Sequence, residues 1–140
     1  MARSNFEKLD VYRLAEDVSD RIWIVVEAWQ HFARDTVGKQ LVRSADSVGA
    51  NIAEGAGRAT YRENCQFIHY ARGSLYETKH WLRRAYRRNL LSQKQIDDLR
   101  PMLDELAPRL NAYLRSIRRN NPPKRPAIPT TDNEQLTTNN

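Results

Sequence analysis

Only a few side chains in this chain have the type and spacing that chemistry requires. Cys65 and His69 stand four residues apart, which would put two soft metal ligands on one face of a helix. Two ligands from a single helix do not complete a metal site, so we expect neither a metal nor another cofactor. A catalytic carboxylate pair, Glu54 with Glu77, is the sharper alternative. The sequence has no glycine-rich phosphate loop, no His-Glu-x-x-His and no paired cysteines, and we therefore predict that the protein is not an enzyme.

Basic residues are the stronger functional lead. Lys plus Arg outnumber Asp plus Glu by 23 to 17, a net charge of +6, and a positive excess bears on the choice of partner. On a helical wheel, one set of residues shares the face opposite the expected core, and two further arginines flank it. The set is Arg72, Tyr76, Lys79, His80, Arg83 and Arg87, flanked by Arg84 and Arg88.

The chemistry of this face suits nucleic acid. Like charges four residues apart oppose helix stability by a few tenths of a kcal/mol per pair, a cost that bound phosphates would offset. Arginine pairs bidentately with phosphate, and Tyr76 could stack on an unpaired base. A solvated helix face without a partner is the alternative. A second acid-free basic run lies near the end of the chain, at Arg115, Arg118, Arg119, Lys124 and Arg125.

Amphipathic helices must position these residues. Apolar residues recur at steps of three and four over 6–32, where Asn5 could cap the start and Trp29 and Phe32 belong to the inward stripe. The run Ile22–Val26 is apolar on all sides; a strand is possible there on propensity, but helix fits the flanks better. A helical turn that is apolar all round needs cover on more than one side, which favours oligomerisation.

The second helix is expected over 37–56, with Asp35 or Thr36 as its cap. Small residues line its buried stripe. Gly55 and Gly57 would end it, because glycine reaches the left-handed conformation of a helix C-cap without steric cost. Thr60-x-x-Glu63 is a capping box that starts a third helix over 60–89.

A second capping box, Ser92-x-x-Gln95, predicts a short antiparallel connection into a fourth helix. Pro101 and Pro108 lie inside that helix, and we expect kinks or an early break, unless their shared face lets the helix curve around its neighbours. Periodicity then disappears. We expect one domain over residues 1–118 and a flexible, proline-rich tail over 119–140.

Polar residues on or beside the buried stripes need partners. These are Asn51, Glu54, Ser74 and Glu77, with Arg43, Arg58 and Arg72 as plausible counter-ions. A shared network among them would fix helix register and oligomer geometry.

Three motifs resemble one known family. Residues 47–58 match Ser-x-x-x-Asn-Ile-Ala-Glu-Gly-x-x-Arg, residues 71–77 match Ala-x-Gly-Ser-Leu-x-Glu, and residues 9–12 resemble Leu-x-Val-Trp with Tyr12 for the usual Trp. The chain thereby resembles the bacterial four-helix-bundle proteins encoded in intervening sequences of large-subunit ribosomal RNA genes. The resemblance covers roughly residues 6–91. Where most of that family has a proline-containing turn, this chain has Ala33-Arg34-Asp35-Thr36.

The resemblance implies an all-α, antiparallel up-down-up-down four-helix bundle that forms homopentamers. It also points to a ribosomal RNA setting, and relatives include accessory proteins of diversity-generating retroelements, which pair with a reverse transcriptase and RNA. Our expectation is an oligomeric protein that binds RNA or other nucleic acid. The alternative is a scaffold for an acidic protein partner.

The compartment follows from absences in the sequence. No apolar run is long enough to span a membrane, and charged residues interrupt any candidate secretion signal near the start. The lone Cys65 cannot form an internal disulfide. We therefore expect a cytoplasmic protein with no membrane contact.

Overall fold

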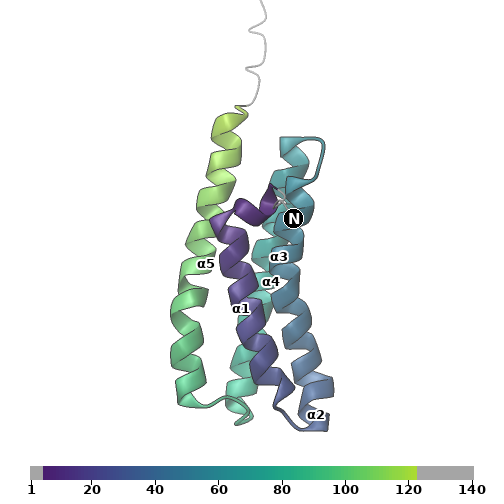
Figure 1. Cartoon of the computed structure of the whole chain (residues 1–140), viewed down its shortest axis with the longest axis vertical. Helices are drawn as coiled ribbons and strands as arrows, with labels where there is room; N and C mark the ends of the chain where they lie inside the picture. The colour runs from purple at the N-terminus through teal and green to yellow at the C-terminus, as the bar shows by residue number, and fades with distance from the viewer. Residues whose placement is uncertain (1–4, 123–140) are drawn as a thin grey trace, which may run out of the picture.

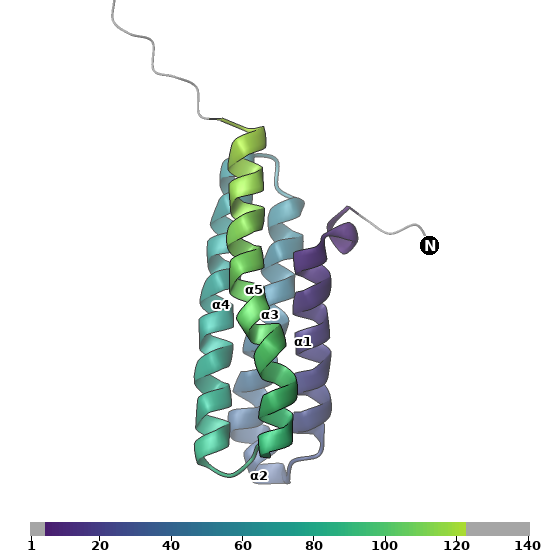
Figure 2. The same ribbon diagram turned by 90° about the vertical axis from the view of Figure 1, so that its left-hand side faces the viewer.

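Four long antiparallel helices make up the body of the protein. The computed structural model describes residues 5–122. The long helices are α1 (Asp10–Glu27), α3 (Lys39–Ala56), α4 (Tyr61–Arg87) and α5 (Gln93–Asn120). They lie side by side, each running opposite to the one before it (Figure 1; Figure 2). The all-α four-helix bundle predicted from the sequence is confirmed, and no strand occurs within residues 5–122.

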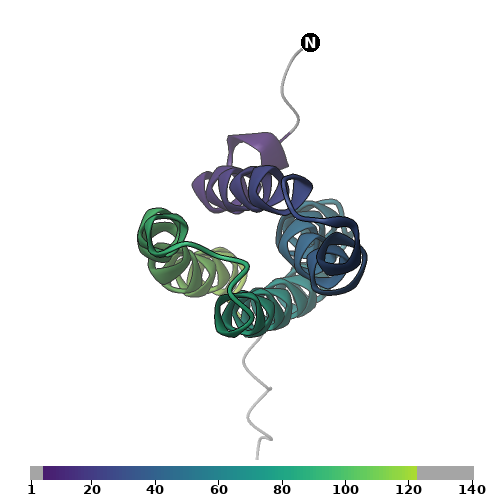
Figure 3. The same cartoon turned by 90° about the horizontal axis from the view of Figure 1, so that it is seen from below.

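The order of the helices around the bundle follows their order in the chain. Seen along its axis, α1 packs against α3 and α5, and α4 packs against α3 and α5 (Figure 3). Short connections require this arrangement, because consecutive helices can only turn back on a neighbour. The contact between α1 and α5, the first and last of the long helices, completes the bundle.

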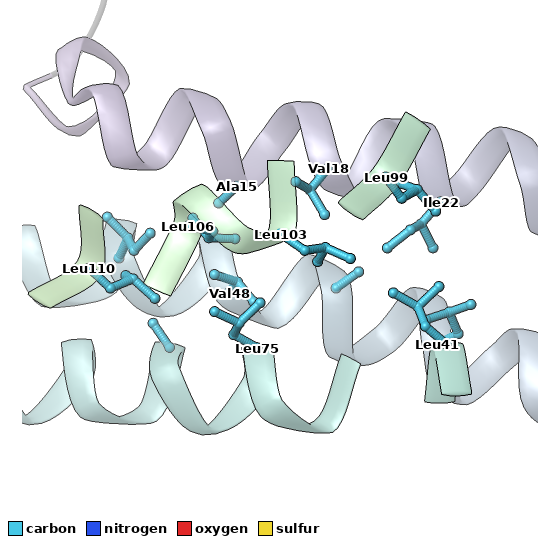
Figure 4. Close-up of a cluster of buried hydrophobic side chains, with 14 of the residues drawn as sticks. Ala15, Val18, Ile22, Leu41, Val48, Leu75, Leu99, Leu103, Leu106 and Leu110 are labelled. Carbon is cyan, nitrogen blue, oxygen red and sulfur yellow. The ribbon is translucent and has the colours of Figure 1, made fainter. Parts of the chain in front are cut away.

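The core follows the predicted apolar stripes. Buried Val18 and Ile22 of α1 face Leu41 and Val48 of α3, Leu75 of α4, and the leucines of α5 (Figure 4). The run Ile22–Val26 is helical, as predicted. Its outer side chains remain uncovered in the single chain, with Trp23 56% and Ile24 66% exposed.

The first connection differs from the sequence prediction. The predicted helix over 6–32 is a short 3₁₀ turn, η1 (Phe6–Lys8), followed by α1, which ends at Glu27. Gln30 is extended, and a new helix begins at His31. Phe32 therefore lies outside the predicted stripe and is 81% exposed. Asn5 precedes η1 but makes no side-chain cap.

The second helical segment begins earlier than expected because its first turns are continuous with α3. It comprises α2 (His31–Ala33) and a π-helical turn, η2 (Arg34–Gly38), which leads directly into α3. Asp35 and Thr36 are thus inside the helix and do not cap it. Asp35 pairs with His31 at 3.1 Å, and the Thr36 hydroxyl donates to the Phe32 carbonyl at 2.7 Å. Gly38 is buried, and a Cβ there would lie 2.7 Å from Cγ1 of Val26.

The turn between α3 and α4 is also built differently from the prediction. Gly57 has φ −88°, so neither glycine adopts the left-handed cap. Gly55 is required instead by close approach, because a Cβ would lie 2.8 Å from Cβ of Phe67 on α4. Thr60 does cap α4 by accepting from the Glu63 backbone N–H at 3.2 Å, which is one of the two hydrogen bonds of the predicted capping box. Within residues 5–122, the residue that adopts a left-handed conformation is Asn89, with φ 59°, just beyond the end of α4.

The hairpin from α4 to α5 matches its prediction. Ser92 and Gln95 form the complete capping box, with both hydrogen bonds present. The helix then passes through Pro101 and Pro108 without ending, and both prolines are exposed. It runs to Asn120, two residues beyond the expected domain boundary. The rest of the predicted tail, residues 123–140, lies outside the described residues.

Candidate nucleic-acid interface

The outer face of α4 carries the predicted basic residues. Thr60 starts the helix and the stripe through Ile68, Leu75 and Leu82 is buried, which turns the opposite side outward. Side chains exposed there are Arg72, Tyr76, His80, Arg83, Arg87 and Arg88, whereas Lys79 and Arg84 are half-buried. The structure thus places all eight predicted site residues on α4 or at its end.

The cations of this face take part in no ion pair within the described residues. Ion pairs in the described part of the chain join Arg13, Arg34, Arg58 and Arg109 to carboxylates, and the His31 ring contacts Asp35. None involves a cation of the α4 face. Lys79 instead extends over the Tyr76 ring, with Nζ 5.6 Å from the ring centroid. Tyr76 remains 56% exposed and available for stacking.

A groove runs between α4 and α5 beside this face. Its volume is about 400 Å³. The floor is apolar, formed by Leu82, Ile96, Leu99 and Leu103. The rim is mainly cationic, with Lys79, Arg83, Arg100, Tyr86 and Asp104. Lys79 and Arg83 therefore belong to both the α4 face and the groove.

Sequence reasoning missed Tyr86 and Arg100 as members of this site. The feature of the sequence that could have indicated them is the short connection between α4 and α5. It sets the last turns of α4 beside the first turns of α5, so Arg100 comes next to the basic end of α4. A helical wheel drawn for α4 alone cannot show that a residue of α5 lies beside it.

The second basic cluster lies at the other end of the bundle. Arg115, Arg118 and Arg119 are exposed on the last turns of α5, whereas Arg87 and Arg88 lie just before the short connection into its first turn. At 1.5 Å per residue the separation is about 35 Å. Arg87 and Arg88 therefore cannot contact the same phosphates as this second cluster. Lys124 and Arg125 lie outside the described residues.

The polar motif residues do not form the shared network that we expected. Asn51 donates to the Ser47 carbonyl at 2.8 Å, and Glu54 pairs with Arg58 of the next turn at 2.7 Å. The backbone carbonyl of Ser74 accepts from Thr78. Glu77 is exposed, and within residues 5–122 no hydrogen bond or ion pair links these four side chains to one another. Arg43 and Arg72 pair with no carboxylate there.

Two other polar contacts link neighbouring helices instead of the expected network. Thr78 of α4 lies 3.1 Å from the Ser44 hydroxyl of α3, and both side chains are buried. Ser19 of α1 donates to the carboxylate of Asp46 on α3. These pairs set the register of α3 against both of its neighbours.

The residues considered for metal or acid–base chemistry do not gather into a larger site within residues 5–122. Cys65 is half-buried and His69 is exposed, and no group of three or more potential metal ligands occurs within residues 5–122. Glu54 is near the end of α3 and Glu77 is in the middle of α4. Across the same residues, no helix is long and apolar enough to cross a membrane.

Comparison with known proteins found a matching family model and a similar crystal structure. A family model described as 23S rRNA-intervening sequence protein matches residues 7–112. A crystal structure of a protein of unknown function, from the S23 ribosomal protein family of Bacteroides thetaiotaomicron, is similar with a TM-score of 0.62 and 23% identity. The match covers 76% of this chain and 96% of the other, and at that identity it shows the fold alone. No curated protein sequence matches.

Proposed function

The chain belongs to the 23S rRNA-intervening sequence protein family, and from this premise we propose that it is a non-enzymatic, oligomeric protein that binds RNA through the basic face of α4. The observation that carries the proposal is the set of unpaired cations on that face. Like charges at i, i+4 spacing, such as the half-buried Lys79 and the exposed Arg83 and Arg87, repel one another in the free protein. Phosphate groups would relieve this repulsion and accept their hydrogen bonds.

Exposed apolar residues support the oligomer. Trp23, Ile24 and Phe32 are 56%, 66% and 81% exposed, and all lie toward the end of the bundle where α1 meets α2. Large apolar side chains gathered at one end of a small domain are typical of an interaction surface. We propose that copies of this chain cover them, with a pentamer favoured. A ring of copies repeats the α4 face, and avidity would then strengthen weak binding at each copy.

A protein scaffold is the second candidate function, because the same cations would also fit an acidic protein such as a reverse transcriptase partner. The two ligands differ in salt dependence. Phosphate contacts release condensed counterions, so the logarithm of the affinity falls steeply and linearly with the logarithm of the salt concentration. A protein interface gives a shallower dependence.

The test measures RNA affinity against salt for two variants of equal charge. The first replaces Arg83, Arg84, Arg87 and Arg88 with Ala. The control replaces Arg13, Arg34, Arg58 and Arg109, the arginines already paired with acids, so it loses the same charge away from the α4 face. Exposed pairs of this kind contribute only about 0–1 kcal/mol each to stability.

Fluorescence anisotropy with a labelled structured RNA, at several salt concentrations, gives the slope for each protein. We expect the slope of the α4 variant to be shallower than wild type by about 3, with the control close to wild type. Equal losses in the two variants would mean that net charge alone attracts RNA. Absence of any salt-sensitive complex with the wild-type protein would refute the proposal and favour the scaffold.

A further inference from the structure

The groove between α4 and α5 has a chemistry that the α4 face alone does not have. Its floor is apolar, and cations reach its rim from both helices. We propose that this groove seats a single unpaired nucleotide of bound RNA, with the base on the floor and the flanking phosphates on Lys79, Arg83 and Arg100. This inference rests on the proposed function and specifies the form of RNA that the protein selects.

The size of the groove suits one nucleotide. Small-molecule sites occupy about 300–1,000 Å³, and this groove, at about 400 Å³, is near the lower limit. A peptide helix is about 10–12 Å across and would need a longer apolar track to bury one face. The short floor therefore favours a compact ligand.

The charge pattern suits a nucleotide that is anionic at one end and aromatic at the other. Lys79, Arg83 and Arg100 make no ion pair with any carboxylate in residues 5–122, so they are free to bind phosphate. Tyr86 is 48% exposed at the rim, where its ring can stack on a base. Asp104 would repel phosphate, but its carboxylate can accept from an amino group on a base edge.

The groove is continuous with the α4 face through Lys79 and Arg83. A strand held by its phosphates along α4 therefore passes the groove mouth, where an unpaired base can turn in. The bases of a duplex are paired inside the helix and cannot do so. The protein should thus prefer single-stranded or bulged RNA to a perfect duplex.

The experiment compares one RNA in two forms. A short labelled single strand and a duplex of the same length are titrated with the full-length protein at one salt concentration. Tyr86→Ala is compared with Tyr61→Ala, which removes an exposed tyrosine from the start of α4, outside the groove. Thermal melting of each variant shows that the bundle is intact.

We expect wild type to prefer the single strand. Tyr86→Ala should weaken single-strand binding about tenfold, the size of effect expected when one stacking ring is lost, and leave duplex binding within about twofold. Tyr61→Ala should change neither. Arg100→Ala should also weaken single-strand binding selectively, which links the α5 side of the groove to the ligand.

Four results would overturn the inference. Equal affinity for both RNA forms, or equal effects of Tyr86→Ala and Tyr61→Ala, would remove the groove from recognition while leaving RNA binding on α4 intact. If the groove variants instead lost binding of an acidic amphipathic peptide and kept RNA binding, the groove would be a protein-docking site. If wild type bound no RNA, the proposed function would fail together with the inference.

Discussion

Gly55 of α3 and Phe67 of α4 meet so closely that a Cβ atom on the glycine would lie 2.8 Å from Cβ of the phenylalanine. The same atom would lie 2.7 Å from Oδ1 of Asn64 and 3.1 Å from its backbone carbonyl. Neither a Cβ nor a backbone oxygen can swing away as the end of a long side chain can. The distance between α3 and α4 at this corner is therefore set by the absence of a side chain at position 55.

Replacing Gly55 with Ala should destabilise the bundle. Overpacking costs about 1–3 kcal/mol, and the better helix propensity of alanine returns about 1 kcal/mol. We expect a net loss of up to about 2 kcal/mol in the free energy of unfolding, measured by urea denaturation. An unchanged or higher stability would show that α3 and α4 can move slightly further apart at this corner without a cost in free energy.

Gly73→Ala is the matched control, because a Cβ at position 73 would make no close contact like the one at Gly55. Gly73 is exposed in the middle of α4, and a Cβ there would meet nothing within 4 Å. Alanine should therefore raise the free energy of unfolding by about 0.5–1 kcal/mol. If the two substitutions change the free energy of unfolding in opposite directions in the same urea experiment, the effect of packing is separated from that of helix propensity.

The buried hydroxyls of Ser44 and Thr78 should be coupled. Thr78→Val keeps the shape of the side chain and removes its contacts with Ser44 Oγ and the Ser74 carbonyl, so we expect a loss of about 1 kcal/mol. Ser44→Ala added to it should cost less than the sum of the single changes. Exact additivity in a double-mutant cycle would contradict the contact, and Thr36→Val provides an exposed control.

Tyr12 should make stability fall at high pH. A hydrogen bond with Glu16, together with burial and nearby carboxylates, raises the pKa of Tyr12 to about 12. The folded protein therefore holds the phenolic proton more tightly than the unfolded chain, whose tyrosine pKa is about 10. This stabilisation is complete below about pH 10 and is lost as the pH rises toward 12.

Tyr12→Phe isolates this contribution from other groups that titrate at high pH. The difference in unfolding free energy between wild type and variant should be constant from pH 7 to 9 and should shrink between about pH 10 and 12. A difference independent of pH across that window would mean that the Tyr12 pKa is not raised.

Disrupting the exposed apolar end should reduce the oligomer. Trp23→Glu with Phe32→Glu places charges in the proposed contact, and because both residues are exposed in the single chain, its fold should survive. We expect light scattering after size-exclusion chromatography to show a smaller species with unchanged helical circular dichroism. The same substitution at Tyr61, which is 44% exposed elsewhere, should leave the mass unchanged.

The sequence predicted those features of the fold that depend on local period and capping. The third and fourth helices, the Thr60 cap and the Ser92–Gln95 box were predicted correctly, because each depends on residues within a few positions of one another. Pro101 and Pro108 did not break α5, since packed leucines on its inner face hold the helix through both.

What the sequence could not predict depends on contacts between elements. The break at Ala28–Gln30 interrupts a region whose apolar period continues to Phe32, and it brings Gly38 close to Val26, a contact between elements that the period does not encode. Gly55 looked like a cap because its neighbour on α4 was unknown. Likewise, the groove residues Tyr86 and Arg100 become partners only when α4 and α5 pair.

The sequence-ordered packing of the helices also bears on how fast the chain folds. Apart from α1 with α5, every pair of packed long helices is joined directly by a short connection. Such topologies have low contact order, and helical bundles of this kind typically fold in microseconds to milliseconds. The α3–α4 and α4–α5 hairpins can form early from local contacts. Docking of α5 on α1 then closes the longest loop, so substitutions at that interface should mainly accelerate unfolding.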